Sequence, residues 1–140
     1  MRQILLFAAL AASLALLSGC ALSRAKEDKA EDMPGKAAYH KISAEEAYEM
    51  MASQEVVVVD VRTREEYDGG HIPNAILVPN ESIGDDMPEA LPDKEATLLI
   101  YCRSGRRSKD AAQKLLELGY QSVYDFGGVI DWPYELVKEG

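Results

Sequence analysis

A cysteine followed by three arginines is the part of this sequence best suited to chemistry. Directly after an apolar run comes Cys102, and the residues behind it are Arg103, Ser104, Gly105, Arg106 and Arg107. Cationic neighbours and the positive end of a helix both lower the pKa of a thiol, because they stabilise the thiolate. Gly105 permits backbone angles that other residues avoid, so the amides of this loop can converge on an anion. The segment therefore predicts a reactive thiolate at Cys102 inside a cradle for a small anion.

The residues on either side of this loop predict how Cys102 is positioned. Residues 97–101 form a strand-like apolar run, and residues 105–118 repeat apolar side chains three and four positions apart, as an amphipathic helix does. A cysteine between a strand and a helix lies at the carboxyl edge of a parallel sheet, where open sheets of this kind bind ligands. We expect the anion cradle at that edge.

The rest of the pattern predicts an α/β fold, with a central, mostly parallel sheet and helices on both faces. Further apolar runs predict strands at residues 56–59, 75–78 and 122–124. Capping-box patterns that begin at Ser43 and Thr63 predict helices over residues 44–52 and up to the glycine pair at 69–70. Residues 80–93 predict a loop or a loosely wound helix. After a turn at residues 127–128, residues 129–138 predict a closing helix with Trp132 and Leu136 on its buried side.

The first 19 residues have the pattern of an export signal. Arg2 precedes a short apolar core, which ends in Leu17-Ser18-Gly19-Cys20. This tetrad resembles the bacterial lipobox, whose cysteine becomes lipidated after cleavage. The resemblance implies an exported protein that is lipid-anchored at Cys20 on the periplasmic side of the envelope, at the outer membrane where the cell has one. The alternative is an uncleaved anchor helix.

Composition indicates where the domain begins and which partners and cofactors are not expected. Residues 20–41 are rich in Ala, Lys, Glu and Asp without an apolar stripe, which predicts a flexible tether ahead of a domain at residues 42–140. The net charge of −9 argues against nucleic acid as a partner, because phosphate binding needs a basic surface. With two histidines and, once Cys20 is lipidated, one free cysteine, no metal site or cofactor is expected.

Four signatures give residues 42–137 a resemblance to single-domain rhodaneses. They stand in the family's order: Val59-Asp60-Val61-Arg62, Gly70-His71-Ile72-Pro73-Asn74-Ala75, the loop Cys102 to Arg107, and Phe126-Gly127-Gly128 with Trp132 beyond. The resemblance implies a ping-pong sulfurtransferase. Cys102 would take the outer sulfur of a donor such as thiosulfate as a persulfide and pass it to a thiol or to cyanide. A partner protein could also be the acceptor.

The resemblance also implies roles for the neighbouring residues. The amides of residues 103–107 would surround the persulfide, with Arg103 and Arg106 recognising the anionic donor. Arg107 is left open between a structural role and substrate binding. Asp60 stands at a strand end, where it can pair with an arginine, so Asp60 and Arg62 are expected to support the loop. His71 is expected to order its turn through a fixed hydrogen bond, since a thiolate needs no base.

Two other functions stay open. A cysteine phosphatase also holds a thiolate in an anion cradle, but its loop resembles Cys, five residues and then Arg, whereas Ser108 stands at that position here. A lipid-tethered docking module or persulfide carrier would use the same fold to bind a partner protein. Retention of Cys102 in an intact arginine loop argues against a purely passive module, but a carrier needs the same residues as an enzyme.

Overall fold

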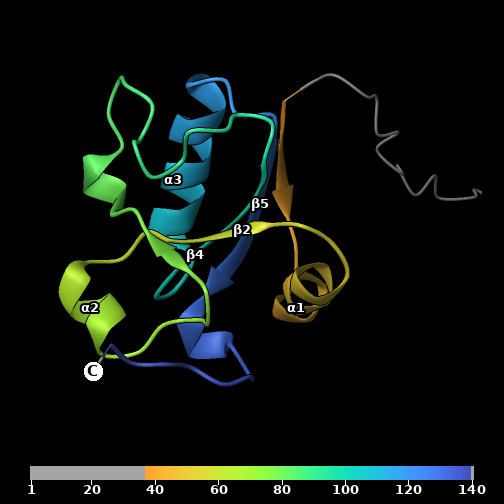
Figure 1. Cartoon of the computed structure of the whole chain (residues 1–140), viewed down its shortest axis with the longest axis vertical. Helices are drawn as coiled ribbons and strands as arrows, with labels where there is room; N and C mark the ends of the chain where they lie inside the picture. Colours follow the sequence, from red (N-terminus) through yellow and green to blue (C-terminus); the bar gives the residue numbers. More distant parts are fainter. Residues whose placement is uncertain (1–36, 140) are drawn as a thin grey trace, which may run out of the picture. The chain divides into compact units, whose positions relative to one another are not determined.

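The computed structural model describes residues 37–139, which form one five-stranded sheet with helices packed on it (Figure 1). The strands are β1 (Ala38–Lys41), β2 (Val57–Asp60), β3 (Ile76–Leu77), β4 (Thr97–Cys102) and β5 (Ser122–Gly128). Their order across the sheet is β1-β5-β4-β2-β3, and every neighbouring pair is parallel. The predicted α/β fold is confirmed, and parallel pairing brings the carboxyl ends of all strands to one edge.

Three α-helices and two short 3₁₀ helices complete the domain. The helices are α1 (Ala44–Ser53), α2 (Arg64–Asp68) and α3 (Arg106–Glu117), and the 3₁₀ turns are η1 (Asn80–Ser82) and η2 (Val129–Asp131). Both predicted capping boxes are present, because Ser43 and Thr63 each accept a hydrogen bond from the amide three residues on. In the predicted loop at residues 80–93, η1 is the only helical turn.

The sheet separates two apolar cores, because successive side chains of a strand point to opposite faces. One core joins Leu98 and Ile100 of β4 to Leu115 of α3. The other core joins Leu99 and Tyr101 of the same strand to Ala47 of α1 and Tyr67 of α2. The helices therefore cover both faces of the sheet, as predicted: α3 packs in the first core and α1 in the second (Figure 1).

The boundary between tether and domain was predicted too late in the chain. Residues 38–41, which were assigned to the tether, form the edge strand β1 and pair with Ser122 to Asp125 of β5. The Tyr39 hydroxyl donates to Asp125 at 2.7 Å, so this polar strand is held by a contact across 86 residues. The predicted signal peptide, the lipidation site Cys20 and the rest of the tether lie outside the described residues. Among residues 37–139, no helix is long and apolar enough to cross a membrane.

The predicted closing helix over 129–138 is wrong. After η2, the chain runs extended, and Val137 exchanges two backbone hydrogen bonds with His71, at 2.9 and 2.8 Å. Pro133 lacks the amide hydrogen that a helix interior requires, which explains the break. Trp132 is buried as expected, whereas Leu136 is 40% exposed. The glycines at 127–128 end β5 instead of forming a separate turn.

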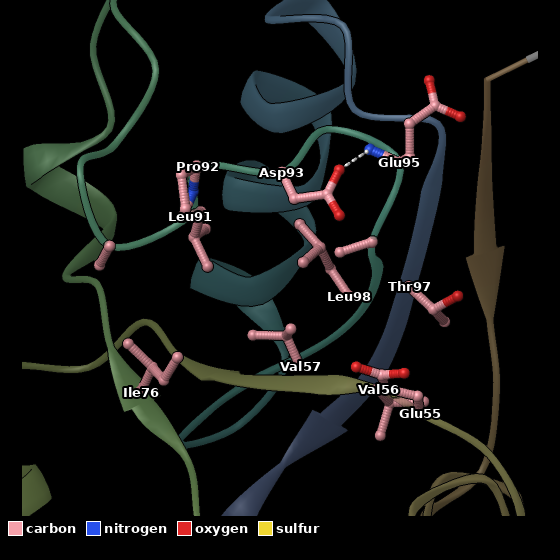
Figure 2. A pocket seen from close by; sticks show the side chains of 12 residues that line it. Glu55, Val56, Val57, Ile76, Leu91, Pro92, Asp93, Glu95, Thr97 and Leu98 are labelled. Carbon is pink, nitrogen blue, oxygen red and sulfur yellow. Dashed lines mark hydrogen bonds between the residues drawn. The ribbon is translucent and has the colours of Figure 1, made fainter.

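A groove of about 510 Å³ opens at the amino edge of the sheet (Figure 2). Its lining comes from the first residues of β2, β3 and β4, from the two residues before β2 and from the loop before β4: Glu55, Val56, Val57, Ile76, Ala90, Leu91, Pro92, Asp93, Glu95, Ala96, Thr97 and Leu98. Cys102 is the last residue of β4, at the opposite edge. This groove therefore does not hold the predicted chemistry.

Candidate active site

Cys102 lies at the carboxyl edge of the sheet, where the sequence predicted it. It is the last residue of β4, it pairs with Gly128 of β5, and only 1% of it is exposed. The amide of Gly105 donates to its sulfur at 3.0 Å. Gly105 itself has a φ of 101° and caps α3, so the glycine bends the chain back towards the sulfur as the helix begins.

The cradle around the sulfur is made of backbone amides. Burial raises the pKa of this thiol, but hydrogen bonds from the amides of Ser108, Gly105 and Ser104 outweigh burial and place the pKa below its ordinary value. Part of this effect was predicted to come from the three arginines. In the described domain, the Gly105 amide makes the shortest contact with the sulfur, at 3.0 Å. Arg107 contributes as well, since its pKa is raised first by its hydrogen bonds to Glu66 and also by the charge of Cys102.

The three arginines divide into two groups. Arg103 and Arg106 are exposed at the rim of the loop, and the carbonyl of Arg103 accepts from the amide of Ile130 at 3.2 Å. Arg107 makes a bidentate ion pair with Glu66, with both nitrogen–oxygen distances 2.8 Å. Since Glu66 also closes the capping box of α2, this pair ties α2 to the first turn of α3. Arg107 thus has a structural contact, whereas the side chains of Arg103 and Arg106 make no ion pair within residues 37–139.

A buried ion pair supports the strand that ends in Cys102. Asp60 and Arg62 contact each other at 2.6 Å, and the hydroxyl of Tyr101 donates to Asp60 at 2.6 Å. Arg62 also donates to the carbonyl of Gly70 at 2.8 Å. The expected pairing of Asp60 with an arginine is therefore present, and it fixes the residue directly before Cys102.

His71 holds its turn through contacts of both its side chain and its backbone. Its Nδ1 lies 2.8 Å from the carbonyl oxygen of Tyr67, and the two rings stack with centroids 3.6 Å apart. Its backbone carries the bridge to Val137. The fixed hydrogen bond expected of His71 is thus present.

Comparison with known proteins agrees with this arrangement. The family described as Rhodanese-like domain matches residues 43–133. The chain belongs to the rhodanese-like domain family. A solved rhodanese from E. coli is 35% identical and aligns with a TM-score of 0.56, over 61% of this chain and all of that one. A rhodanese-like domain protein from Staphylococcus aureus is 32% identical, with a TM-score of 0.63, over 72% of this chain and 99% of that one.

Longer proteins contain the same domain. A thiosulfate sulfurtransferase from Pseudomonas aeruginosa is 28% identical with a TM-score of 0.64, and the match covers 73% of this chain and 21% of that one. A curated relative, the tRNA uridine(34) hydroxylase of Yersinia pestis, is 31% identical over 106 residues. That match covers 72% of this chain, which spans only 30% of the length of the relative.

Two polar residues of this rhodanese-like domain were missed as site residues. The Ser108 hydroxyl lies 3.7 Å from the Cys102 sulfur and donates to Asp125 at 2.8 Å, and both polar residues are buried. Ser108 was noted only as a departure from the phosphatase loop. A signal for Asp125 existed, because a lone acid interrupts the apolar strand before the glycine pair. Its contact with Ser108 spans 17 residues and is visible only in the fold.

A shallow groove of about 590 Å³ leads to the loop of the rhodanese-like domain. Arg103 is part of its wall, together with Arg62, Glu65, Glu66, Gly69, Gly70, Val129, Ile130 and Leu136. Ile130 is 62% exposed and Leu136 is 40% exposed, so part of the wall of this groove is apolar.

The close packing of the loop on Gly128 allows a first prediction. A methyl group added at Gly128 would lie 2.6 Å from Cα of Ser104 and closer still to the carbonyl oxygen of Arg103. We expect Gly128→Ala to displace the cradle, to cost about 1–3 kcal/mol of unfolding free energy and to slow reactions at Cys102 about a hundredfold. Gly84→Ala is the matched control, because nothing lies within 4 Å of the added methyl group there. A Gly128→Ala protein as active as the control would contradict this packing.

The pair between Glu66 and Arg107 predicts a pH dependence of stability. The hydrogen bonds from Arg107 hold the pKa of Glu66 at about 2, against an ordinary value of 4.5. A depressed carboxyl pKa stabilises the fold fully above the ordinary value, and this stabilisation is lost as the pH falls towards the folded-state value. We expect Glu66→Gln to cost about 1 kcal/mol at pH 7, with a gap to the unchanged protein that closes as the pH falls below 4.5. Urea titrations at a series of pH values measure the gap, and a gap that stays constant would contradict the ion pair.

Proposed function

We propose that this protein is a sulfurtransferase, which moves sulfane sulfur from a small anionic donor such as thiosulfate to a thiophilic acceptor through a persulfide on Cys102. The observation that carries the proposal is the sulfur of Cys102 inside a ring of loop amides, with Gly105 donating at 3.0 Å. Membership of the rhodanese-like family and the likeness to solved sulfurtransferases support it.

The first half of the reaction loads the enzyme. The Cys102 thiolate attacks the outer sulfur of thiosulfate, a sulfur–sulfur bond to Cys102 forms, and the bond to the sulfonate group breaks with its electron pair leaving on sulfite. The charge of the thiolate is thereby moved to the outer sulfur of the persulfide. Loop amides that point into the cradle stabilise this charge without having to reorganise, as donors in an oxyanion hole do.

The second half of the reaction unloads the enzyme. A thiolate acceptor attacks the outer sulfur, takes it as a new persulfide and returns the Cys102 thiolate. Arg103 and Arg106, exposed at the rim, are assigned to attract the donor, whereas Arg107 is occupied by Glu66. A protein acceptor would use the same chemistry, so the proposal covers a persulfide carrier as well as an enzyme with a small acceptor.

One assay separates sulfur transfer from phosphatase activity. The protein is incubated with thiosulfate, released sulfite is measured, and peptide mass spectrometry locates any added sulfur. The same preparation is then assayed with an aryl phosphate. We expect sulfite release and one added sulfur atom on Cys102. Phosphate release without added sulfur would overturn the proposal. Ser108 supports the expected result. It stands where the phosphatase loop has its arginine, and its hydroxyl donates a hydrogen bond to Asp125.

We also propose that the protein is exported and held at a membrane by lipid on Cys20. The support is the sequence Leu17-Ser18-Gly19-Cys20 behind a short apolar core. The described domain begins at the amino end of β1, whereas Cys102 lies at the carboxyl end of β4, so the active site faces away from the edge at which the chain enters. Mass spectrometry of the N-terminal peptide from isolated membranes tests the lipid, and an unmodified, uncleaved Cys20 peptide would refute it.

A further inference from the structure

Behind the cradle, a buried carboxylate contacts a hydroxyl group that lies beside the Cys102 sulfur. Asp125 and Ser108 are 1% and 0% exposed. The Ser108 oxygen lies 2.8 Å from Oδ1 of Asp125, 3.0 Å from the carbonyl oxygen of Gly105 and 3.7 Å from the Cys102 sulfur. No step of the sulfur transfer proposed above uses Asp125.

The direction of the single Ser108 hydroxyl proton determines whether Ser108 donates a hydrogen bond to the Cys102 sulfur or accepts one from it. Among its neighbours, the Asp125 carboxylate is the shortest contact and the charged one, so the proton points there. The Ser108 oxygen then turns a lone pair to Cys102, and the contact is one in which the thiol donates to the serine. A bare thiolate at the same place would face a lone pair, with a carboxylate behind it.

Hydrogen-bond donors and one ammonium group surround the Asp125 carboxylate. From β1, the Tyr39 hydroxyl donates to Oδ2 at 2.7 Å, and the Lys41 ammonium group lies 3.4 Å from it. From β5, the amide of Gly127 donates to Oδ1 at 2.9 Å. Burial and the contact with Asp125 raise the pKa of Tyr39 to about 12, so this hydroxyl remains a neutral donor. The sulfur itself accepts from the amide of Gly105 at 3.0 Å.

Loading with sulfur moves the negative charge away from this carboxylate. In the thiolate, the charge is on the sulfur that faces Ser108. In the persulfide, it is on the outer sulfur, about 2 Å further out, where the loop amides receive it. We propose that Asp125, acting through the Ser108 hydroxyl, disfavours the bare Cys102 thiolate relative to the Cys102 persulfide. Asp125 is then a positioning residue that favours the sulfur-loaded form. This inference rests on the proposed function.

The equilibrium between thiosulfate and sulfite measures the effect directly. In loading, the thiolate and thiosulfate give the persulfide and sulfite, so the loaded fraction at a fixed sulfite-to-thiosulfate ratio reports the relative stability of the two forms. We expect Asp125→Asn to shift this equilibrium about three- to tenfold towards unloaded protein, the change expected when one hydrogen bond of ordinary net strength is lost. Half-maximal alkylation of Cys102 should also move to a lower pH. An unchanged equilibrium, or a shift to a higher pH, would overturn the inference.

Two further variants make the test specific. Asp110→Asn removes one negative charge from exposed α3 surface, where Asp110 pairs with Lys114, and should change neither reading. Ser108→Ala removes the lone pair that receives the thiol proton, so alkylation should again move to a lower pH. A move to a higher pH would mean that Ser108 donates to the thiolate, and this would refute the inference even if Asp125→Asn failed to fold. If the unchanged protein takes no sulfur from thiosulfate, the proposed function itself fails.

Discussion

Cys102→Ser is expected to abolish sulfur transfer, with a fall in thiosulfate turnover of about a thousandfold or more. The serine hydroxyl is not ionised at neutral pH, and an alkoxide is not stabilised by a cradle that suffices for a thiolate. Its oxygen also cannot form the sulfur–sulfur bond that stores the transferred atom. Sulfite release from thiosulfate, followed with an acceptor thiol present, measures the loss.

The fold should survive this change. Serine is smaller than cysteine by a fraction of an atomic radius, and its hydroxyl can accept from the Gly105 amide as the sulfur does. Urea denaturation should therefore show a change of about 1 kcal/mol. Full turnover by Cys102→Ser would contradict the persulfide mechanism. Binding of a partner protein that survives the loss of turnover would reveal a separate docking role.

Arg62→Met is expected to destabilise the domain by about 3–5 kcal/mol. Arg62 and Asp60 are both buried, and the methionine would leave the carboxylate with the Tyr101 hydroxyl as its remaining side-chain partner. It would also free the carbonyl of Gly70, which Arg62 now satisfies. The free energy of unfolding from urea titration at neutral pH gives the cost.

The matched control for this prediction is Arg64→Met, two residues on. Arg64 pairs with Asp68 at 3.5 Å, but its side chain is 70% exposed. Exposed pairs contribute little, so the change should stay within about 0.5 kcal/mol. Equal losses in the two variants would show that burial of the Asp60–Arg62 pair is not what matters. The double change Asp60→Asn with Arg62→Met should recover part of the loss, because no unpaired charge is left inside.

Local patterns in the sequence were enough to predict most elements of the fold. The run before Cys102 is apolar on both faces of its strand, which is typical of a strand in a buried parallel sheet. Ser43 and Thr63 open helices whose capping boxes involve only residues three positions apart. Because these interactions are local, the periodicity of the chain contains them.

The two errors in the fold have a common physical cause. The strand at residues 38–41 has no apolar alternation and is held by pairing with β5, more than 80 residues away. At the other end, residues 129–138 place Trp132 and Leu136 four positions apart, a spacing that suits one face of a helix. Pro133 and the backbone pairing of Val137 with His71 override that preference. Contacts between distant segments decide both cases, and no short window of sequence contains them.

The candidate site shows the same division. Cys102 and the glycine that lets amides converge on it belong to one short segment, so their chemistry could be predicted. The partner of Arg107 is Glu66, 41 residues earlier, and without knowledge of this pair Arg107 could not be distinguished from Arg103 and Arg106. Likewise, Asp125 reaches Ser108 only because β5 lies beside β4.

The rate of alkylation of Cys102 as a function of pH tests the central claim most directly. Iodoacetamide modification is read at Cys102 by peptide mass spectrometry, which keeps Cys20 out of the measurement. The urea-unfolded chain serves as the reference, with an ordinary thiol pKa of about 8.5. In the folded protein, we expect half-maximal alkylation clearly below that pH. Half-maximal alkylation at or above the pH found for the unfolded chain would show that the loop does not stabilise a thiolate, and would contradict the account.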